Sequence, residues 1–191
     1  MNTETIFRLI TFLVLLSAFC VSIYFRRKAE REGGRMQTSE GQKLVVVLRL
    51  LGLIVILPLL GYLINPAWVS WAQFELPNAV RWAAALVAIA AIPVFYWIFV
   101  SIGVNISPTQ ATRQNHKLVT HGPYRWMRHP LYSVGFVVAV ALTLLTALWW
   151  LAVGMVLPLL ILLWRTSKEE AWLIETFGDE YREYVKRTGR F

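Results

Sequence analysis

The chain has 191 residues, of which 57% are hydrophobic and only 16% are charged, and its mean hydropathy is +0.54. Water-soluble domains carry about 25% charged and 45–50% apolar residues, so this composition excludes an ordinary soluble protein. The net charge of +8 suggests nucleic acid, but the basic residues cluster at the edges of apolar blocks. We therefore expect an integral membrane protein with no nucleic-acid partner.

A single membrane domain over residues 1–191 is predicted, because no glycine-, serine- or proline-rich linker divides the sequence. Residues 1–100 hold three apolar blocks, and residues 101–191 hold the polar motifs. The one cysteine, Cys20, lies in the first block and cannot form an intramolecular disulfide. One cysteine and three histidines without metal-ligand spacing predict no metal cofactor.

The first three apolar blocks each have the length of a membrane-spanning helix. They cover residues 6–25, 44–64 and 79–100, and about 20 apolar residues cross a ~30 Å hydrocarbon core. The first block lacks the small-residue cleavage site of a signal peptide and runs into RRKAER, so we expect it to be retained.

The last apolar stretch, residues 131–164, is too long for one crossing and too short for two crossings with an ordinary loop. As a helix it would be roughly 50 Å long at 1.5 Å per residue. We therefore expect two short helices of about 17 residues each, which form a tight helical hairpin with its turn near Thr146. The predicted fold is all-α and polytopic: five transmembrane helices with a tight C-terminal hairpin.

Charge asymmetry predicts the orientation of these spans. Segments 26–43, 101–130 and 165–191 would share one side and together hold sixteen lysines and arginines, whereas segment 65–78 on the other side holds none. The positive-inside rule then places the N-terminus outside and the basic segments in the cytoplasm.

A cytoplasmic C-terminal helix is predicted after residue 164. Gly178 marks a break in it, since glycine commonly terminates helices. Tyr181, Tyr184 and Val185 repeat at helical spacing and are expected to be the apolar face with which this helix docks.

The densest polar cluster of the chain lies just before the hairpin. It reads HKLVTHGPYRWMRHPLY over residues 116–132, and a second cluster, RTSKEE, follows the hairpin at residues 165–170. A hairpin brings its two ends together, so the clusters should face each other across a partly apolar cavity suited to a small amphipathic ligand. The expected lining is His116, Tyr124, His129, Tyr132, Arg165, Glu169 and Glu170.

Simpler interpretations of these clusters stay open. Arginine, tyrosine and tryptophan at a span end commonly anchor it at the lipid headgroups. Gly122 and Pro123 either turn the chain into the next helix or contact a ligand directly. A non-catalytic scaffold or transporter component is a further alternative, although no charged residue lies at the membrane depth of the hairpin.

The same residues resemble the isoprenylcysteine carboxyl methyltransferase family and, more loosely, the phospholipid N-methyltransferases. The resemblance covers about the last 80 residues, through the RHPxY element, the double glutamate and the FGxEYxxY tail. It implies a five-span helical membrane enzyme that uses S-adenosylmethionine as methyl donor. The earlier spans match only in number and hydrophobicity.

The resemblance also implies residue roles. Arg165, four residues before Glu169, would engage a substrate carboxylate. The implied cofactor contacts are Gln110, which is one position out of register, His116, Lys117, Leu118, Val119, Tyr124, His129, Pro130, Leu131, Tyr132 and Glu169.

The methyl acceptor is expected to be lipophilic and to arrive from the bilayer. A prenylcysteine-like carboxylate is predicted first, because a carboxylate is already a nucleophile at neutral pH. A phospholipid amine is the alternative, and it would need a proton acceptor, for which Glu170 is the candidate. The expected location is the inner or plasma membrane of a prokaryote or the endoplasmic reticulum of a eukaryote, with the site on the cytoplasmic face.

Overall fold

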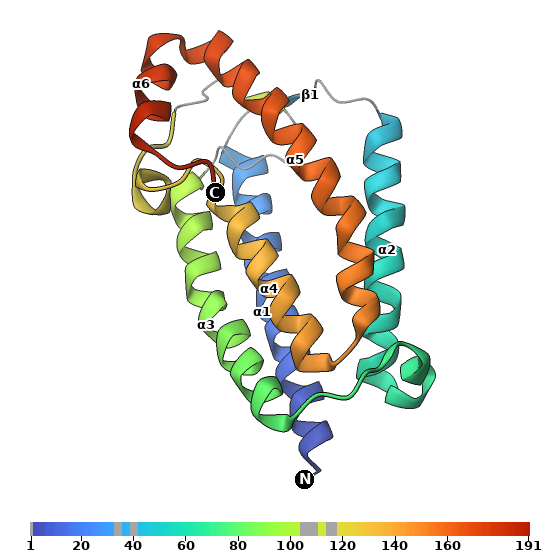
Figure 1. The fold of residues 1–191 in the computed structure, drawn as a ribbon. Coiled ribbons are helices and arrows are strands. Elements are labelled where there is room, and N and C mark those ends of the chain that lie inside the picture. The colour runs from blue at the N-terminus through green and yellow to red at the C-terminus, as the bar shows by residue number, and fades with distance from the viewer. Residues whose placement is uncertain (1, 33–35, 39–41, 104–110, 114–117) are drawn as a thin grey trace.

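The chain folds into a bundle of long helices with two short strands at one end (Figure 1). The structure, a computed structural model, describes residues 2–32, 36–38, 42–103, 111–113 and 118–191. In chain order the elements are α1 (Thr3–Glu32), β1 (Met36–Thr38), α2 (Gln42–Ile64), the 3-10 helix η1 (Pro66–Ala72), α3 (Asn78–Ile102), β2 (Ala111–Arg113), the 3-10 helix η3 (Gly122–Arg125), α4 (Pro130–Thr146), α5 (Trp149–Phe177) and α6 (Asp179–Arg187).

Four of these helices are long and apolar enough to cross a membrane: α1, α2 from Val46, α3 and α5. The fifth apolar helix, α4, has 17 residues. Large apolar side chains such as Leu57, Leu86 and Leu160 are more than half exposed on the bundle surface. A bilayer accommodates such a surface, and helices satisfy their backbone groups internally, so the protein is an integral membrane protein, as predicted.

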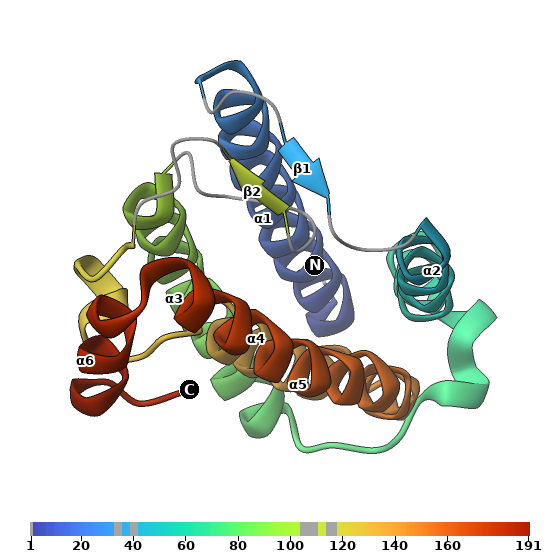
Figure 2. The ribbon, with the colours of Figure 1, turned by 90° about the horizontal axis from the view of Figure 1, so that it is seen from above.

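The two strands are an addition to the all-helical fold that we expected. β1 and β2 pair antiparallel, with Gln37 opposite Thr112, and so connect the segment after α1 with the segment after α3 (Figure 2). A three-residue strand is too short to show the alternating pattern from which strands are recognised in a sequence.

α3 lies on one side of the bundle (Figures 1 and 2). It packs along α4 and α1, while α2 packs against α5 on the other side of the molecule (Figures 1 and 2). Ala84, Ala85 and Ala88 of α3 are buried in this contact. Small residues allow helix backbones to approach closely. In a membrane this matters because close packing, and not the hydrophobic effect, drives the association of helices.

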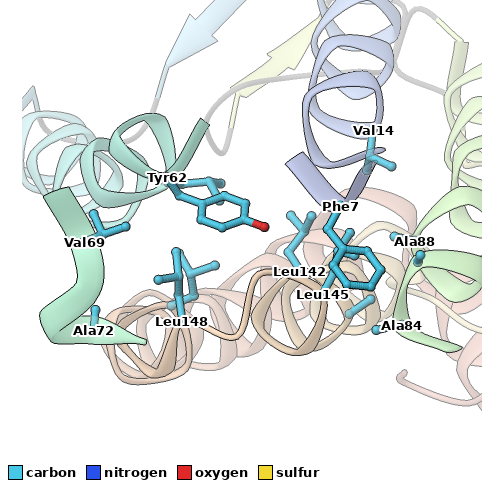
Figure 3. Packing of buried hydrophobic residues seen from close by; sticks show 14 residues of the cluster. Phe7, Val14, Tyr62, Val69, Ala72, Ala84, Ala88, Leu142, Leu145 and Leu148 are labelled. Carbon is cyan, nitrogen blue, oxygen red and sulfur yellow. The ribbon is translucent and has the colours of Figure 1, made fainter. Parts of the chain in front are cut away.

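The main apolar core lies at the end of the bundle where α1 and α3 begin and α2 and α4 end (Figure 3). Phe7, Tyr62, Leu145 and Leu148 are fully buried there, each from a different segment of the chain. The opposite end of the bundle, where α4 begins and α5 ends, has only a small cluster of Phe25, Ala29 and Phe99.

The connection from α4 to α5 is the tight turn that the length of the apolar stretch predicted. α4 ends at Thr146 and α5 begins at Trp149. Ala147 adopts the left-handed conformation, with φ 53°, and its carbonyl accepts a hydrogen bond of 3.0 Å from the Phe74 N–H. The loop before α3 therefore crosses the turn and holds it.

A network of hydrogen bonds around Arg81 joins the helices at this end. Its guanidinium donates to both carboxylate oxygens of Glu4, at 2.7 and 3.1 Å, and its Nε donates to the Leu145 carbonyl at 2.9 Å. The Tyr62 hydroxyl donates to the same carboxylate at 2.6 Å. Since Glu4 lies on α1, Tyr62 on α2, Arg81 on α3 and Leu145 on α4, one arginine connects four helices, here called the Arg81 network.

Replacing Glu4 with glutamine is expected to destabilise the fold by about 1–2 kcal/mol, discounted because this carboxylate is partly exposed. The charge-assisted pair with Arg81 is lost, while the side-chain size is kept. The free energy of unfolding in mixed detergent micelles measures the effect. Glu75→Gln, at an exposed glutamate in the loop before α3, is the control and should match the wild type. Equal stability of the two variants would contradict a structural role for the network.

Candidate functional site

The polar residues of the chain gather at the end of the bundle opposite the main core. We call this the polar end, formed by residues 118–130 before α4 and residues 165–191 from the last turns of α5 onward (Figure 1). Both clusters that the sequence analysis singled out contribute to it. The hairpin of α4 and α5 returns the chain to this end, so segments about 40 residues apart in the sequence meet.

The short helix η3 is held against the end of α3 by a close backbone approach. Gly122 has φ +60°, and a Cβ atom at this position would lie 2.2 Å from the Ser101 Oγ. The Trp97 and Trp126 rings pack edge to face nearby, 5.8 Å apart. Gly122 was expected either to turn the chain or to contact a ligand. The structure supports the turn, because only glycine tolerates both this positive φ and the close approach to Ser101.

The C-terminal segment fixes η3 and the following loop from the other side. The Tyr184 hydroxyl donates to the Tyr124 carbonyl at 2.6 Å. Met127 and Gly189 form a parallel bridge, and the His129 N–H donates to the Arg190 carbonyl at 3.1 Å. The loop before α4 thus has hydrogen-bonded neighbours on α6 and on the residues after it.

Glu170 takes part in two ion pairs and one histidine contact at the polar end. Its carboxylate lies 2.9 Å from the Arg128 Nε, 3.0 Å from Arg190 Nη2 and 3.3 Å from His129 Nε2. Arg128 also donates to the Thr188 carbonyl, at 2.6 Å. The Arg128 and Glu170 side chains are only 11% and 17% exposed, so solvent screens this pair weakly.

His129 is neutral at physiological pH. Burial lowers its pKa from 6.5 to about 4, more than the neighbouring Glu170 carboxylate raises it. An ionised carboxylate can only accept hydrogen bonds, so the contact with Glu170 requires the imidazole proton on Nε2. Nδ1 of His129 is then a hydrogen-bond acceptor.

Tyr132 connects this histidine with the second glutamate. The His129 and Tyr132 rings are stacked, with centroids 5.4 Å apart and planes inclined by 4°. The Tyr132 hydroxyl donates to Glu169 Oε2 at 3.2 Å. The first turn of α4 therefore orients the carboxylate of Glu169 on α5.

A pocket of about 100 Å³ opens between these groups. Sites that enclose a whole drug-sized ligand measure about 300–1,000 Å³, so this pocket has room for only a part of such a ligand. Five chemical types meet in it: apolar side chains, an imidazole, a carboxylate, a guanidinium and phenols. It is lined by Ile102, Leu118, Val119, Tyr124, Arg128, His129, Glu169, Leu173, Tyr181 and Tyr184.

The structure brings together several of the residues predicted from the sequence and separates others. Five of them line the pocket: Leu118, Val119, Tyr124, His129 and Glu169. Tyr132 contacts Glu169, and buried Pro130 begins α4, where its missing N–H needs no partner. The side chain of Leu131 packs on the small cluster of Phe25 and Phe99 instead. Gln110, His116 and Lys117 lie outside the described residues.

The two residues predicted for substrate chemistry do not line the pocket. Arg165 lies one turn before Glu169 on α5, half-buried and nearer the apolar part of the helix. Glu170 faces Arg128 and Arg190. Sequence reasoning in turn missed the pocket positions of Arg128, Tyr181 and Tyr184; both tyrosines were expected only as a docking face.

The class of protein follows from these features: a helical integral membrane protein with a small pocket of mixed polar and apolar lining at one end of its bundle. The family model of the isoprenylcysteine carboxyl methyltransferase (ICMT) family matches residues 83–175. This region, just under half of the chain, is similar to that family, in agreement with the resemblance seen in the sequence, and it includes every residue to which the resemblance gave a role. Tyr181, Tyr184 and the C-terminal segment lie beyond the matched region.

Individual relatives agree with the family match. Over 97 residues the chain is 35% identical to protein-S-isoprenylcysteine O-methyltransferase of Schizosaccharomyces pombe, covering 46% of this chain and 39% of that protein. It is 42% identical over 77 residues to the probable protein-S-isoprenylcysteine O-methyltransferases of Oryza sativa subsp. indica and subsp. japonica, covering 38% of each chain. The match thus spans well under half the length of these relatives.

The residues of the pocket fit the amino-acid end of S-adenosylmethionine. This end is a zwitterion, and the pocket offers a carboxylate, a guanidinium and a neutral imidazole. The Tyr181 hydroxyl is buried in the pocket wall and has no hydrogen-bond partner among the described residues. This hydroxyl is therefore available for a hydrogen bond to a ligand in the pocket.

Gly122→Ala is expected to destabilise the protein by about 2–4 kcal/mol, because the new methyl group overlaps Ser101 and the left-handed φ is strained. In the double variant with Ser101→Gly, part of the loss should return, since the overlap disappears while the strain remains. Unfolding in mixed micelles and binding of S-adenosylhomocysteine are the measurements. Gly135→Ala on α4, which meets no atom within 4 Å, is the control. A Gly122→Ala protein of wild-type stability would exclude this packing role.

Proposed function

We propose that this protein is an S-adenosylmethionine-dependent membrane methyltransferase that methylates the carboxylate of a prenylcysteine-like, lipophilic acceptor. One observation carries the proposal: residues 83–175 match the family, and five residues with implied cofactor contacts within this region line a single pocket. The names of the S. pombe and Oryza relatives describe the same reaction.

The roles of the pocket residues follow from their chemistry. When bound, S-adenosylmethionine supplies an electrophilic methyl group on a sulfonium cation. Glu169, oriented by the Tyr132 hydroxyl, would accept hydrogen bonds from its ammonium group. The aromatic face of Tyr124 could stabilise the cation by about 0.5–2 kcal/mol. Neutral His129 would accept a hydrogen bond at Nδ1 without adding a positive charge beside the sulfonium.

Arg165 is the proposed anchor for the acceptor carboxylate. It lies on α5 one turn from Glu169, so the two side chains share a helix face. A guanidinium binds a carboxylate through two parallel hydrogen bonds, which fixes its direction as well as its position. Because a carboxylate at neutral pH is already ionised, the task of the protein is alignment of the nucleophile, and no base is required.

The amine alternative is supported less well. An amine acceptor must lose a proton, and Glu170 was the candidate to take it. Its carboxylate is engaged by Arg128 and Arg190, and these two guanidinium groups favour its ionised form and occupy its oxygens. We therefore assign Glu170 to positioning the loop before α4 and keep carboxylate methylation as the proposed reaction.

The proposed membrane arrangement has five spans, with the N-terminus outside and the polar end in the cytoplasm. The five apolar helices and the alternation of their directions support the count. The concentration of lysine and arginine at the polar end supports the orientation. A cofactor from the cytoplasm and an acceptor from the bilayer would then meet at the level of the headgroups.

Glu169→Gln is expected to weaken binding of S-adenosylmethionine about 10- to 100-fold, because a neutral amide replaces the carboxylate that holds the ammonium group. Isothermal titration with purified protein in detergent measures the dissociation constant. Glu175→Gln, at an exposed position on the same helix, is the matched control and should bind as the wild type does. Wild-type protein that binds no S-adenosylmethionine would refute the proposed function.

Arg165→Lys is expected to separate the two acceptor classes. Methyl transfer to a carboxylate probe, N-acetyl-S-farnesylcysteine, should fall about 10- to 100-fold in kcat/KM, since lysine cannot form the paired hydrogen bonds. Binding of S-adenosylhomocysteine should change little. Phosphatidylethanolamine in mixed micelles is the competing probe. If the wild-type protein methylates only this amine, and Arg165→Lys preserves that activity, the carboxylate assignment is wrong.

A further inference from the structure

The Tyr181 hydroxyl is a buried group of the pocket wall without a hydrogen-bond partner among the described residues. Tyr181 lies on α6, is 1% exposed, and lines the pocket beside Arg128 and Glu169. No hydrogen-bond partner for its hydroxyl exists among the described residues. Buried hydroxyl groups in folded proteins are nearly always hydrogen-bonded, so an exception at a pocket wall needs an explanation.

Tyr184, one turn further along α6, shows what a structural tyrosine looks like in the same helix. It is also buried, and its ring packs on that of Tyr181 with centroids 5.9 Å apart. Its hydroxyl donates to the Tyr124 carbonyl at 2.6 Å. The two tyrosines therefore share burial and apolar packing and differ only in whether the protein satisfies the hydroxyl.

The charges around Tyr181 indicate which ligand atom its hydroxyl meets. The Arg128 guanidinium lines the same pocket, so this part of the wall favours an anion, whereas Glu169 favours a cation. Burial raises the pKa of Tyr181, which keeps the phenol protonated at physiological pH. A protonated phenol beside a guanidinium offers a hydrogen-bond donor to a carboxylate oxygen.

We propose that Tyr181 is a ligand-binding residue whose hydroxyl donates a hydrogen bond to a carboxylate bound in the pocket, next to Arg128. The inference rests on the proposed function and extends it to a residue outside the matched family region. Two sources of the carboxylate are compatible with the chemistry, the amino-acid end of the cofactor and the acceptor, and the experiment distinguishes them.

Tyr181→Phe removes only the hydroxyl and is the central variant. Without ligand, the protein should unfold at the wild-type temperature or above, because an unsatisfied buried hydroxyl is lost. Affinity for S-adenosylhomocysteine should fall about tenfold, while affinity for methylthioadenosine, which lacks the amino-acid end, should be unchanged. If the affinity for S-adenosylhomocysteine is kept and the KM for N-acetyl-S-farnesylcysteine rises about tenfold, the carboxylate belongs to the acceptor.

Two further variants make the result specific. Tyr184→Phe should lower the unfolding temperature of the ligand-free protein, because the Tyr124 carbonyl loses its donor, and should affect both adenosine ligands alike. Tyr24→Phe, 61% exposed on α1, should behave as the wild type.

The outcomes separate this inference from the proposed function. A Tyr181→Phe protein that binds both ligands and the acceptor as the wild type does would overturn the inference alone. Unfolding at a lower temperature, or failure to fold, would assign the Tyr181 hydroxyl a structural role and overturn it as well. Wild-type protein that binds no S-adenosylhomocysteine would remove the proposed function, and the inference with it.

Discussion

The geometry of the polar end depends on a difference in length between two consecutive antiparallel helices. α4 has 17 residues and α5 has 29. After the tight turn at Ala147, α5 therefore continues for twelve residues, or about 18 Å, beyond the point where α4 begins. The projecting turns carry Glu169, Glu170 and Leu173, and the loop before α4 folds against them. If α4 and α5 had the same length, α5 would end level with the start of α4. The loop before α4 would then have no projecting turns of α5 to fold against.

The main core and the proposed ligand site lie at opposite ends of the bundle. The main core and the Arg81 network lie where α1 and α3 begin, and they join four helices through apolar contacts and one guanidinium. At the polar end, the loop before α4 is joined to α5 and to the C-terminal segment by ion pairs around Glu170 and by backbone hydrogen bonds to residues 189 and 190. Polar groups can face a pocket at this end because the apolar packing that defines the fold is elsewhere.

Long apolar blocks and short motifs were predictable from the sequence, whereas distant partners were not. Block length alone predicted the turn near Thr146, because a fixed rise per residue leaves few solutions for 34 apolar residues. The sequence offered no signal that Arg81 pairs with Glu4, 77 positions away. Tyr181 and Tyr184 are the same residue type and lie on the same face of the predicted helix, so the sequence pattern predicted one role for both. Only the three-dimensional arrangement reveals that one hydroxyl is satisfied and the other is not.

The double glutamate illustrates how adjacent residues of one motif acquire different tasks. Successive side chains on an α-helix point about 100° apart, so two neighbours cannot face the same group. Glu169 lines the pocket and receives the Tyr132 hydroxyl, while Glu170 turns toward Arg128, Arg190 and His129. Arg128 is shared, since it is held by Glu170 and also lines the pocket. In the proposed function, Glu170 would act on a bound ligand through Arg128 and His129, which it contacts, while Glu169 would contact the ligand itself.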